Sequence, residues 1–393
     1  MANGVEHNGR CIALSQRGIL IVNKFRKCMN DIPPSKLILP QHGDQEMVAA
    51  LVSNHQIIDH PELTTTGKSS ESNVSSMAVN WAKKYYTTVT AHEKLSQLKA
   101  PQAQQLQEFE GNRARTVDKL TETLKVASDI AWGKVQNLLG QDIERHAINP
   151  ELINGSQIIA DARKLYSKAI DAYADEESPA RLSVLVGRDI LDLRSKYSQA
   201  DPLVLGFVTM EFHYLGSFLL ESLSQSEQSQ FVPYLKIIDD YLHIPFGEIQ
   251  AAAGNHDRKS PALIAVQHLL QNTTQIASAV YDRVSVQHQG YRSSNGYLTD
   301  TMVKLSSIRD VEIFQSYLCL CALEGGIRPV QQELFPLCVM LYPRLHVSWR
   351  LVQDMLLVLF WEIHDRLSPE DVMVFLPYLR TLTEMFSDDV FQN

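Results

Sequence analysis

Three glutamate–histidine pairs are the side chains of this sequence best suited by type to bind a metal ion or transfer a proton. Each pair is two residues apart: Glu144 with His146, Glu211 with His213, and Glu362 with His364. On an α-helix that spacing turns by about 200°, so the two members of a pair point to opposite faces. The Glu-x-x-His spacing with which helical bundles hold two iron ions is absent from the sequence. The pairs therefore predict no shared metal site.

A polar tetrapeptide, Gly254-Asn255-His256-Asp257, has the composition of a catalytic loop. It resembles the Gly-Asn-His-Asp element of calcineurin-like metallophosphoesterases, and that resemblance implies Asn255 and His256 as ligands of a two-metal centre. The family also needs an upstream Asp-x-His, a Gly-Asp-x-x-Asp and a closing Gly-His-x-His, and none of these occurs in this sequence. We interpret the tetrapeptide as a polar loop before a helix that begins at Ser260.

The cysteines do not indicate a disulfide framework or a zinc site. They are odd in number and irregularly spaced: Cys11, Cys28, Cys319, Cys321 and Cys338. This usage predicts reduced thiols and a cytoplasmic protein, with Cys319 and Cys321 buried. Nucleophile-elbow, phosphate-loop and dinucleotide-binding motifs are also absent. We predict no catalytic, cofactor-binding or metal residues and no cofactor, and we leave open an enzyme of unfamiliar helical type.

Composition narrows the class of protein. The 393 residues are 45% hydrophobic and carry a formal net charge of -9, which argues against a nucleic-acid-coating protein. Basic residues between positions 163 and 196, Arg194 among them, alternate with acidic ones, which is typical of solvated helix surfaces. The apolar stretch 202–220 carries Glu211 and His213 in its middle, which favours a buried helix over a membrane span.

One stretch of sequence occurs twice, with an offset of 144 residues between residues 223–242 and 367–386. The repeated motif consists of Phe231, Pro233, Tyr234 and Leu235 in the first copy and of Phe375, Pro377, Tyr378 and Leu379 in the second. We interpret it as an internal duplication. Since proline removes a helical hydrogen bond, each copy is predicted to form two short helices. The first helix begins after a serine cap, the second begins at the proline, and the aromatic residues are buried.

The remaining pattern predicts a mainly α fold, either a multi-helix bundle or a helical-repeat body. Helix starts are marked by a capping residue before proline at Ser178, Asp201, Ser260 and Ser368. Apolar residues at three- and four-residue steps predict a long helix over residues 101–140. Residues 10–40 contain β-prone runs, although an amphipathic helix over residues 19–29 fits them equally well.

These features divide the chain into a small N-terminal region of possible β content (1–63), a mobile linker (64–80), a long-helix segment (81–200) and a helical domain (201–393). The duplicated units occupy residues 202–245 and 346–389. With no catalytic constellation, the leading hypothesis is a non-enzymatic helical interaction or scaffold protein that binds a protein partner. The alternative is a ligand-binding or sensory domain with a cavity between the duplicated units. The oligomeric state is left open.

Overall fold

A computed structural model describes residues 103–391, with side chains from residue 112 onward. It confirms the mainly α prediction. The predicted N-terminal β element and the predicted linker lie outside the described residues. Within the described part of the chain, no helix is both long enough and apolar enough to cross a membrane.

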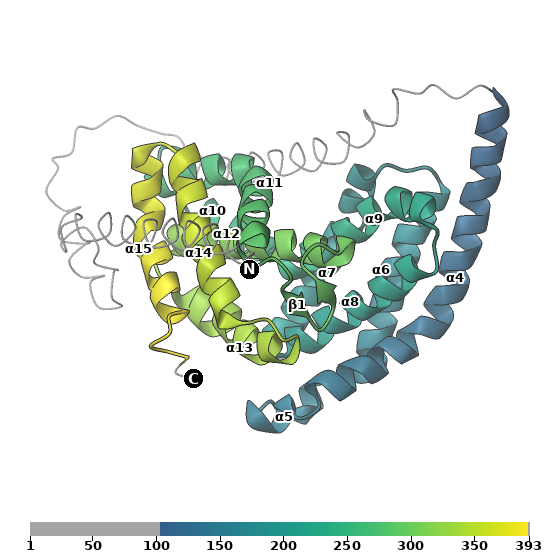
Figure 1. Ribbon diagram of the computed structural model, residues 1–393, viewed down its shortest axis with the longest axis horizontal. Helices are drawn as coiled ribbons and strands as arrows, with labels where there is room; N and C mark the ends of the chain where they lie inside the picture. The colour runs from purple at the N-terminus through teal and green to yellow at the C-terminus, as the bar shows by residue number, and fades with distance from the viewer. Residues whose placement is uncertain (1–102, 392–393) are drawn as a thin grey trace, which may run out of the picture.

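The chain is built from two sets of helices that follow each other in sequence (Figure 1). The amino-terminal half contains α4 (Ala103–Leu139), α5 (Asp142–Arg145), η2 (Pro150–Leu152), α6 (Gly155–Ala174), α7 (Pro179–Ser198), α8 (Val204–Glu221) and α9 (Gln225–His243). The carboxyl-terminal half contains α10 (Phe246–Gly254), α11 (Pro261–Gln287), β1 (Arg292–Ser293), β2 (Gly296–Tyr297), α12 (Thr301–Glu324), the π-helix η3 (Val330–Leu334), α13 (Phe335–Arg344), α14 (Trp349–Arg366) and α15 (Pro369–Met385).

The long predicted helix exists as α4, which runs along one edge of the molecule and packs against α6 and α8 (Figure 1). Its inward face consists of residues that the three- and four-residue steps single out: Leu120, Leu124, Ala127 and Ala131 are buried. Burial of this stripe against two helices stabilises α4, because a helix in water gains little from propensity alone.

The carboxyl-terminal half is organised around α11, which packs against α12, α14 and α15. The two halves meet where α8 contacts α13. Gly206 permits this close approach, since a Cβ atom at that position would collide with the side chain of Met340. The predicted buried helix over residues 202–220 is therefore α8, and it lies at the centre of the molecule (Figure 1).

The serine caps before α7 and α15 are confirmed. Ser178 and Ser368 accept hydrogen bonds from the backbone N–H groups of Arg181 and Asp371. The start predicted at Pro202 is wrong by two residues, because the carboxylate of Asp201 accepts the N–H of Leu203 and α8 begins only at Val204.

The prediction that proline divides each repeated unit into two helices is wrong. Both α9 and α15 continue through Pro233 and Pro377. An interior proline costs about 3 kcal/mol. This cost is offset because each helix buries large side chains on both sides of the proline. The carbonyls that lose their donor belong to Ser229 and Met373, which lie on the exposed side of each helix and are therefore open to solvent.

The two repeated units have the same local organisation, a helical hairpin formed by α8 and α9 in one and by α14 and α15 in the other. The motif side chains Phe231, Tyr234, Leu235, Phe375, Tyr378 and Leu379 are all buried, as predicted. Their surroundings differ in detail, since Phe231 packs edge-on against Tyr173 and stacks on Tyr234. The common ancestry of the two hairpins stays a prediction.

Candidate ligand-binding cavity

The glutamate–histidine pairs point apart, as their spacing predicts. Glu211 is fully buried and its electrostatic neighbours are Asp129 of α4 and Arg163 of α6, whereas His213 lines a cavity next to α8. Glu362 is buried and forms ion pairs with arginines at positions 283 and 366, whereas His364 is half exposed. In both pairs the glutamate is buried, and the histidine two residues later faces a different environment.

The tetrapeptide at residues 254–257 ends α10 and leads into α11. One ring nitrogen of His256 contacts the hydroxyl of Ser260 at 2.8 Å and the other contacts the carbonyl of Leu323 at 2.7 Å. These contacts tie the loop to the end of α12. Across residues 103–391, no group of three or more His, Cys, Asp or Glu side chains is arranged to hold a metal ion.

Cys319, Cys321 and Cys338 are buried and form no disulfide, which confirms the predicted burial of the first two. Burial raises the pKa of the Cys321 thiol to about 12 and also raises the pKa of the Cys338 thiol. Both therefore stay protonated at neutral pH, where a thiol is a poor nucleophile.

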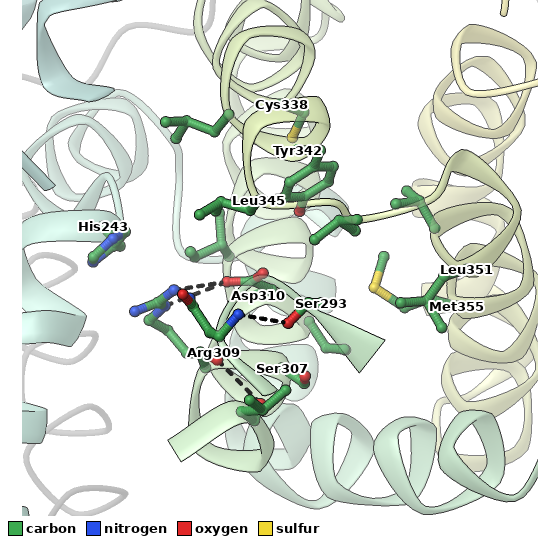
Figure 2. A pocket seen from close by; sticks show the side chains of 18 of the residues that line it. His243, Ser293, Ser307, Arg309, Asp310, Cys338, Tyr342, Leu345, Leu351 and Met355 are labelled. Atoms are coloured by element: carbon green, nitrogen blue, oxygen red, sulfur yellow. Dashed lines mark hydrogen bonds and ion pairs between the residues drawn. The ribbon is translucent and has the colours of Figure 1, made fainter. Parts of the chain in front are cut away.

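A cavity lies where the two halves of the chain meet, and its walls come from both (Figure 2). Its volume is about 190 Å³. Helices α8, α11, α12, α13 and α14 line it, together with the β1–β2 hairpin. In Figure 2, Leu351 and Met355 lie on one side, His243 lies on the opposite side, and Asp310 lies between them.

Most of the cavity wall is aliphatic, and the pattern follows helical steps. Leu337, Leu341 and Leu345 occur every fourth residue along and just after α13, so they lie on one face of that helix. Leu351 and Met355 form a similar stripe on α14. These are the steps that predict a buried helix face, but here the face is turned toward a cavity.

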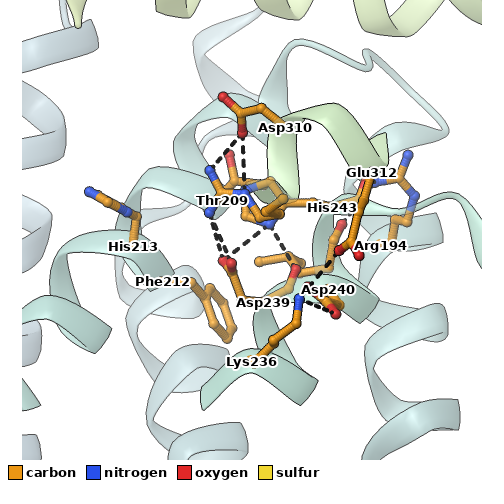
Figure 3. A network of polar contacts seen from close by, with 12 residues as sticks. Arg194, Thr209, Phe212, His213, Lys236, Asp239, Asp240, His243, Asp310 and Glu312 are labelled. Carbon is orange, nitrogen blue, oxygen red and sulfur yellow. Dashed lines mark hydrogen bonds and ion pairs between the residues drawn. The ribbon is translucent and has the colours of Figure 1, made fainter. Parts of the chain in front are cut away.

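The polar end of the cavity is organised by Arg309 of α12 (Figure 2). Figure 3 shows Asp239 and Asp310, the two carboxylates with which it pairs. The Nη1 atom of Arg309 donates to both carboxylate oxygens of Asp239 in α9, at 2.9 and 3.1 Å. Its Nε and Nη2 atoms donate to Oδ1 of Asp310, at 3.3 and 3.0 Å. One guanidinium therefore bridges two carboxylates, in the bidentate manner that arginine favours.

Burial and Arg309 set the charge of the neighbouring groups. Burial alone raises the pKa of Asp239, but Arg309 and His243 outweigh it and lower that pKa to about 2. Burial and Arg309 lower the pKa of both His213 and His243 to about 4. Burial raises the pKa of Asp310, against the opposing effect of Arg309. At neutral pH the two histidines are consequently uncharged and Asp239 is ionised.

A second arginine, Arg194 of α7, also lines the cavity but is only 2% exposed. It donates to the carbonyl of Leu242 at 2.8 Å and to the hydroxyl of Tyr317 at 3.0 Å, and it pairs with Glu333. The prediction that Arg194 belongs to a solvated helix surface is wrong, because three other elements, α9, α12 and η3, contact its guanidinium. The neighbouring basic residues Arg163, Lys168 and Lys196 do pair with acidic residues near the surface.

The short hairpin fastens the polar side of the cavity to both halves. Asn295 contacts the Nε2 atom of His213 at 3.3 Å, and the backbone N–H of Ser294 donates to the carbonyl of Leu345 at 3.0 Å. Tyr291 donates its hydroxyl to the carbonyl of His346 at 2.8 Å. The hairpin thus connects α8 to the end of α13.

None of the eight repeat-motif residues lines this cavity. Sequence reasoning had signals for only part of it: His213 within an apolar helix, and the apolar steps of α13 and α14. No sequence pattern indicated the Asp239–Arg309–Asp310 bridge. Asp239 is distant from Arg309 in sequence and Asp310 is adjacent to it, so the three residues do not recur at three- or four-residue helical steps. Comparison of the chain with known protein families, with characterised proteins and with solved structures finds no match.

Proposed function

We propose that this protein binds a small, predominantly apolar molecule in the cavity between its two halves. The observation that carries the proposal is the cavity itself, with its aliphatic walls and a few polar groups gathered at one end. That combination is typical of small-molecule sites, in which the apolar surface provides affinity and a few polar groups orient the ligand.

The cavity also supports the alternative function that the sequence suggested. First-unit residues such as Met210 and His213 line it, and so do second-unit residues such as Leu351 and Met355. The helices between the two units, α11 to α13, contribute much of the remaining wall. A ligand bound there would contact both halves and stabilise their association, because binding to the folded state alone adds to its stability.

Binding of an uncharged apolar dye, Nile red, tests the proposal. We expect saturable fluorescence enhancement at one dye molecule per chain. The variant Leu341→Trp places a larger side chain in the cavity and should weaken the affinity by at least about tenfold, since the indole occupies part of the space open to the dye. Val184→Trp is the matched control, because Val184 lies on α7 with 70% of its surface exposed and should leave binding unchanged.

The folded state of Leu341→Trp is checked by its melting temperature and helical circular dichroism. A folded variant that binds Nile red as tightly as the parent protein contradicts the proposal. So does equal weakening by Leu341→Trp and by Val184→Trp, because dye binding would then not depend on the cavity.

Protein-partner binding stays a prediction and is the second candidate function. It is favoured by Val126 and Ile130, which lie one turn apart on α4 and are 65% and 53% exposed. Exposed aliphatic neighbours on a long helix suit contact with another helix.

A further inference from the structure

Two arginines line the cavity, and each already pairs with carboxylates. Arg309 directs its donors to Asp239 and Asp310. Arg194 directs its Nη donors to a carbonyl, a hydroxyl and Glu333, and its Nε atom lies 3.6 Å from Glu248 without a hydrogen bond. An acidic ligand, such as a fatty acid or a phosphate ester, would have to displace a carboxylate that is already in place. Desolvating a second anion beside these carboxylates is unfavourable.

In the Asp239–Arg309–Asp310 bridge, one carboxylate oxygen of Asp310 accepts no hydrogen bond. Both hydrogen bonds that Asp310 receives end on Oδ1, so Oδ2 has no hydrogen-bond partner among the described residues. Asp310 lines the cavity and its side chain is 30% exposed. A carboxylate oxygen that is open toward an apolar space favours a ligand with a hydrogen-bond donor.

The charges near Asp310 indicate which donor fits best. When both are ionised, Asp239 and Asp310 carry two negative charges against the single positive charge of Arg309, and burial raises the pKa of Asp310. The two nearby histidines are uncharged at neutral pH. The bridge therefore has a net negative charge when both carboxylates are ionised. A cation placed at Oδ2 would complete the charge balance and form a charge-assisted hydrogen bond.

We propose that the ligand is an apolar amine, whose ammonium group pairs with Oδ2 of Asp310 while its hydrocarbon part lies against Leu341, Leu345 and Leu351. This assignment rests on the proposed function and specifies the chemical class of its ligand. It excludes carboxylic acids and places neutral alcohols second, because an alcohol can donate one hydrogen bond to Oδ2 but brings no charge.

Competition for bound Nile red distinguishes these classes. Octylamine, octanol and octanoate have the same chain length and differ only in their head group. We expect octylamine to displace the dye with a Kd about ten- to a hundredfold lower than that of octanol, the range for a hydrogen bond to a charged group. Octanoate should be the weakest competitor.

The variant Asp310→Asn removes the charge, and because its single oxygen accepts from Arg309, its NH2 group faces the cavity. It should lose the preference for octylamine over octanol. Asp365→Asn is the control, because Asp365 lies on α14, is about half exposed and does not line the cavity. It should retain the preference, which excludes a general attraction of the amine to a chain of net charge -9.

Each other outcome has a definite meaning. The amine assignment is overturned if Asp310→Asn still prefers octylamine, or if octanoate is the tightest competitor. In either case, binding of Nile red to the parent protein still supports the proposed function. Failure of all three competitors to displace bound dye also overturns the assignment. Absence of Nile red binding to the parent protein overturns the proposed function and the assignment with it.

Discussion

Replacing Glu211 by glutamine should stabilise the protein, because burial of the Glu211 carboxyl group lowers the free energy of unfolding by an amount that increases with pH. The side chain of Glu211 is 0% exposed, and neither carboxylate oxygen has a hydrogen-bond partner. Burial, with the charge of Asp129 as a second cause, raises the pKa of Glu211 from its ordinary value of 4.5 to about 8. The folded state therefore holds a proton that the unfolded chain releases.

The magnitude follows from the difference between the two pKa values. Below pH 4.5 both states are protonated and Glu211 contributes no pH dependence. Between that pH and about 8, the free energy of unfolding falls by about 1.4 kcal/mol per pH unit, because the unfolded chain loses a proton that the folded chain keeps. At pH 7 the accumulated loss is roughly 3 kcal/mol. Glu211→Gln cannot ionise and avoids this loss.

The assay is denaturant unfolding of parent and variant at several pH values between 4.5 and 8. The free-energy advantage of Glu211→Gln should grow from near zero at the acidic end to roughly 3 kcal/mol at pH 7. Glu144→Gln makes the same chemical change at an exposed position on α5 and is the matched control. A difference between parent and Glu211→Gln that does not change with pH would refute the reasoning.

Two further predictions concern the repeat motif and the charge bridge. Phe231→Ala and Phe375→Ala should each lower the free energy of unfolding by about 3 to 5 kcal/mol, because both rings are fully buried. Calorimetry showing almost unchanged melting for both would instead indicate a docking role for the motif. Asp239→Ala should cost about 3 kcal/mol, because Arg309 then keeps only one of its two carboxylates. Arg188→Ala is the control: it removes an exposed ion pair and should change the free energy of unfolding by less than about 0.5 kcal/mol. Equal costs for Asp239→Ala and Arg188→Ala would contradict the burial of the Asp239–Arg309 ion pair.

The helical fold was predictable because its signals are local. A serine before proline marks the start of α7 and of α15, and the apolar steps of α4 identify its buried face. Such features depend on neighbours within one or two turns, which the sequence displays directly. The proline rule failed at Pro233 because burial of Phe231, Tyr234 and Leu235 outweighs a local preference, and burial is a property of the whole fold.

The cavity was not predictable, because its polar end depends on contacts between distant residues. Asp239 and Arg309 are 70 residues apart, and only the packing of the carboxyl-terminal half against α9 joins them. Apolar residues that line a cavity have the same spacing as those that fill a core, so Leu337 and Leu341 alone do not distinguish the two. Arg194 belongs to a charge-rich stretch whose other members are at the surface, which concealed its burial.

The coexistence of a cavity and a buried charge bridge is itself an argument for function. Filling such space with larger aliphatic side chains would add dispersion contacts and increase stability. Replacing buried ion pairs by well-packed apolar residues is often stabilising as well. The unfilled space and the buried ion pairs, which both lower stability, occur together at Arg309, Asp239 and Asp310. One carboxylate oxygen of Asp310 has no hydrogen-bond partner among the described residues. A chain selected for stability alone would lose these features, whereas a chain selected to bind a molecule at that oxygen would keep them.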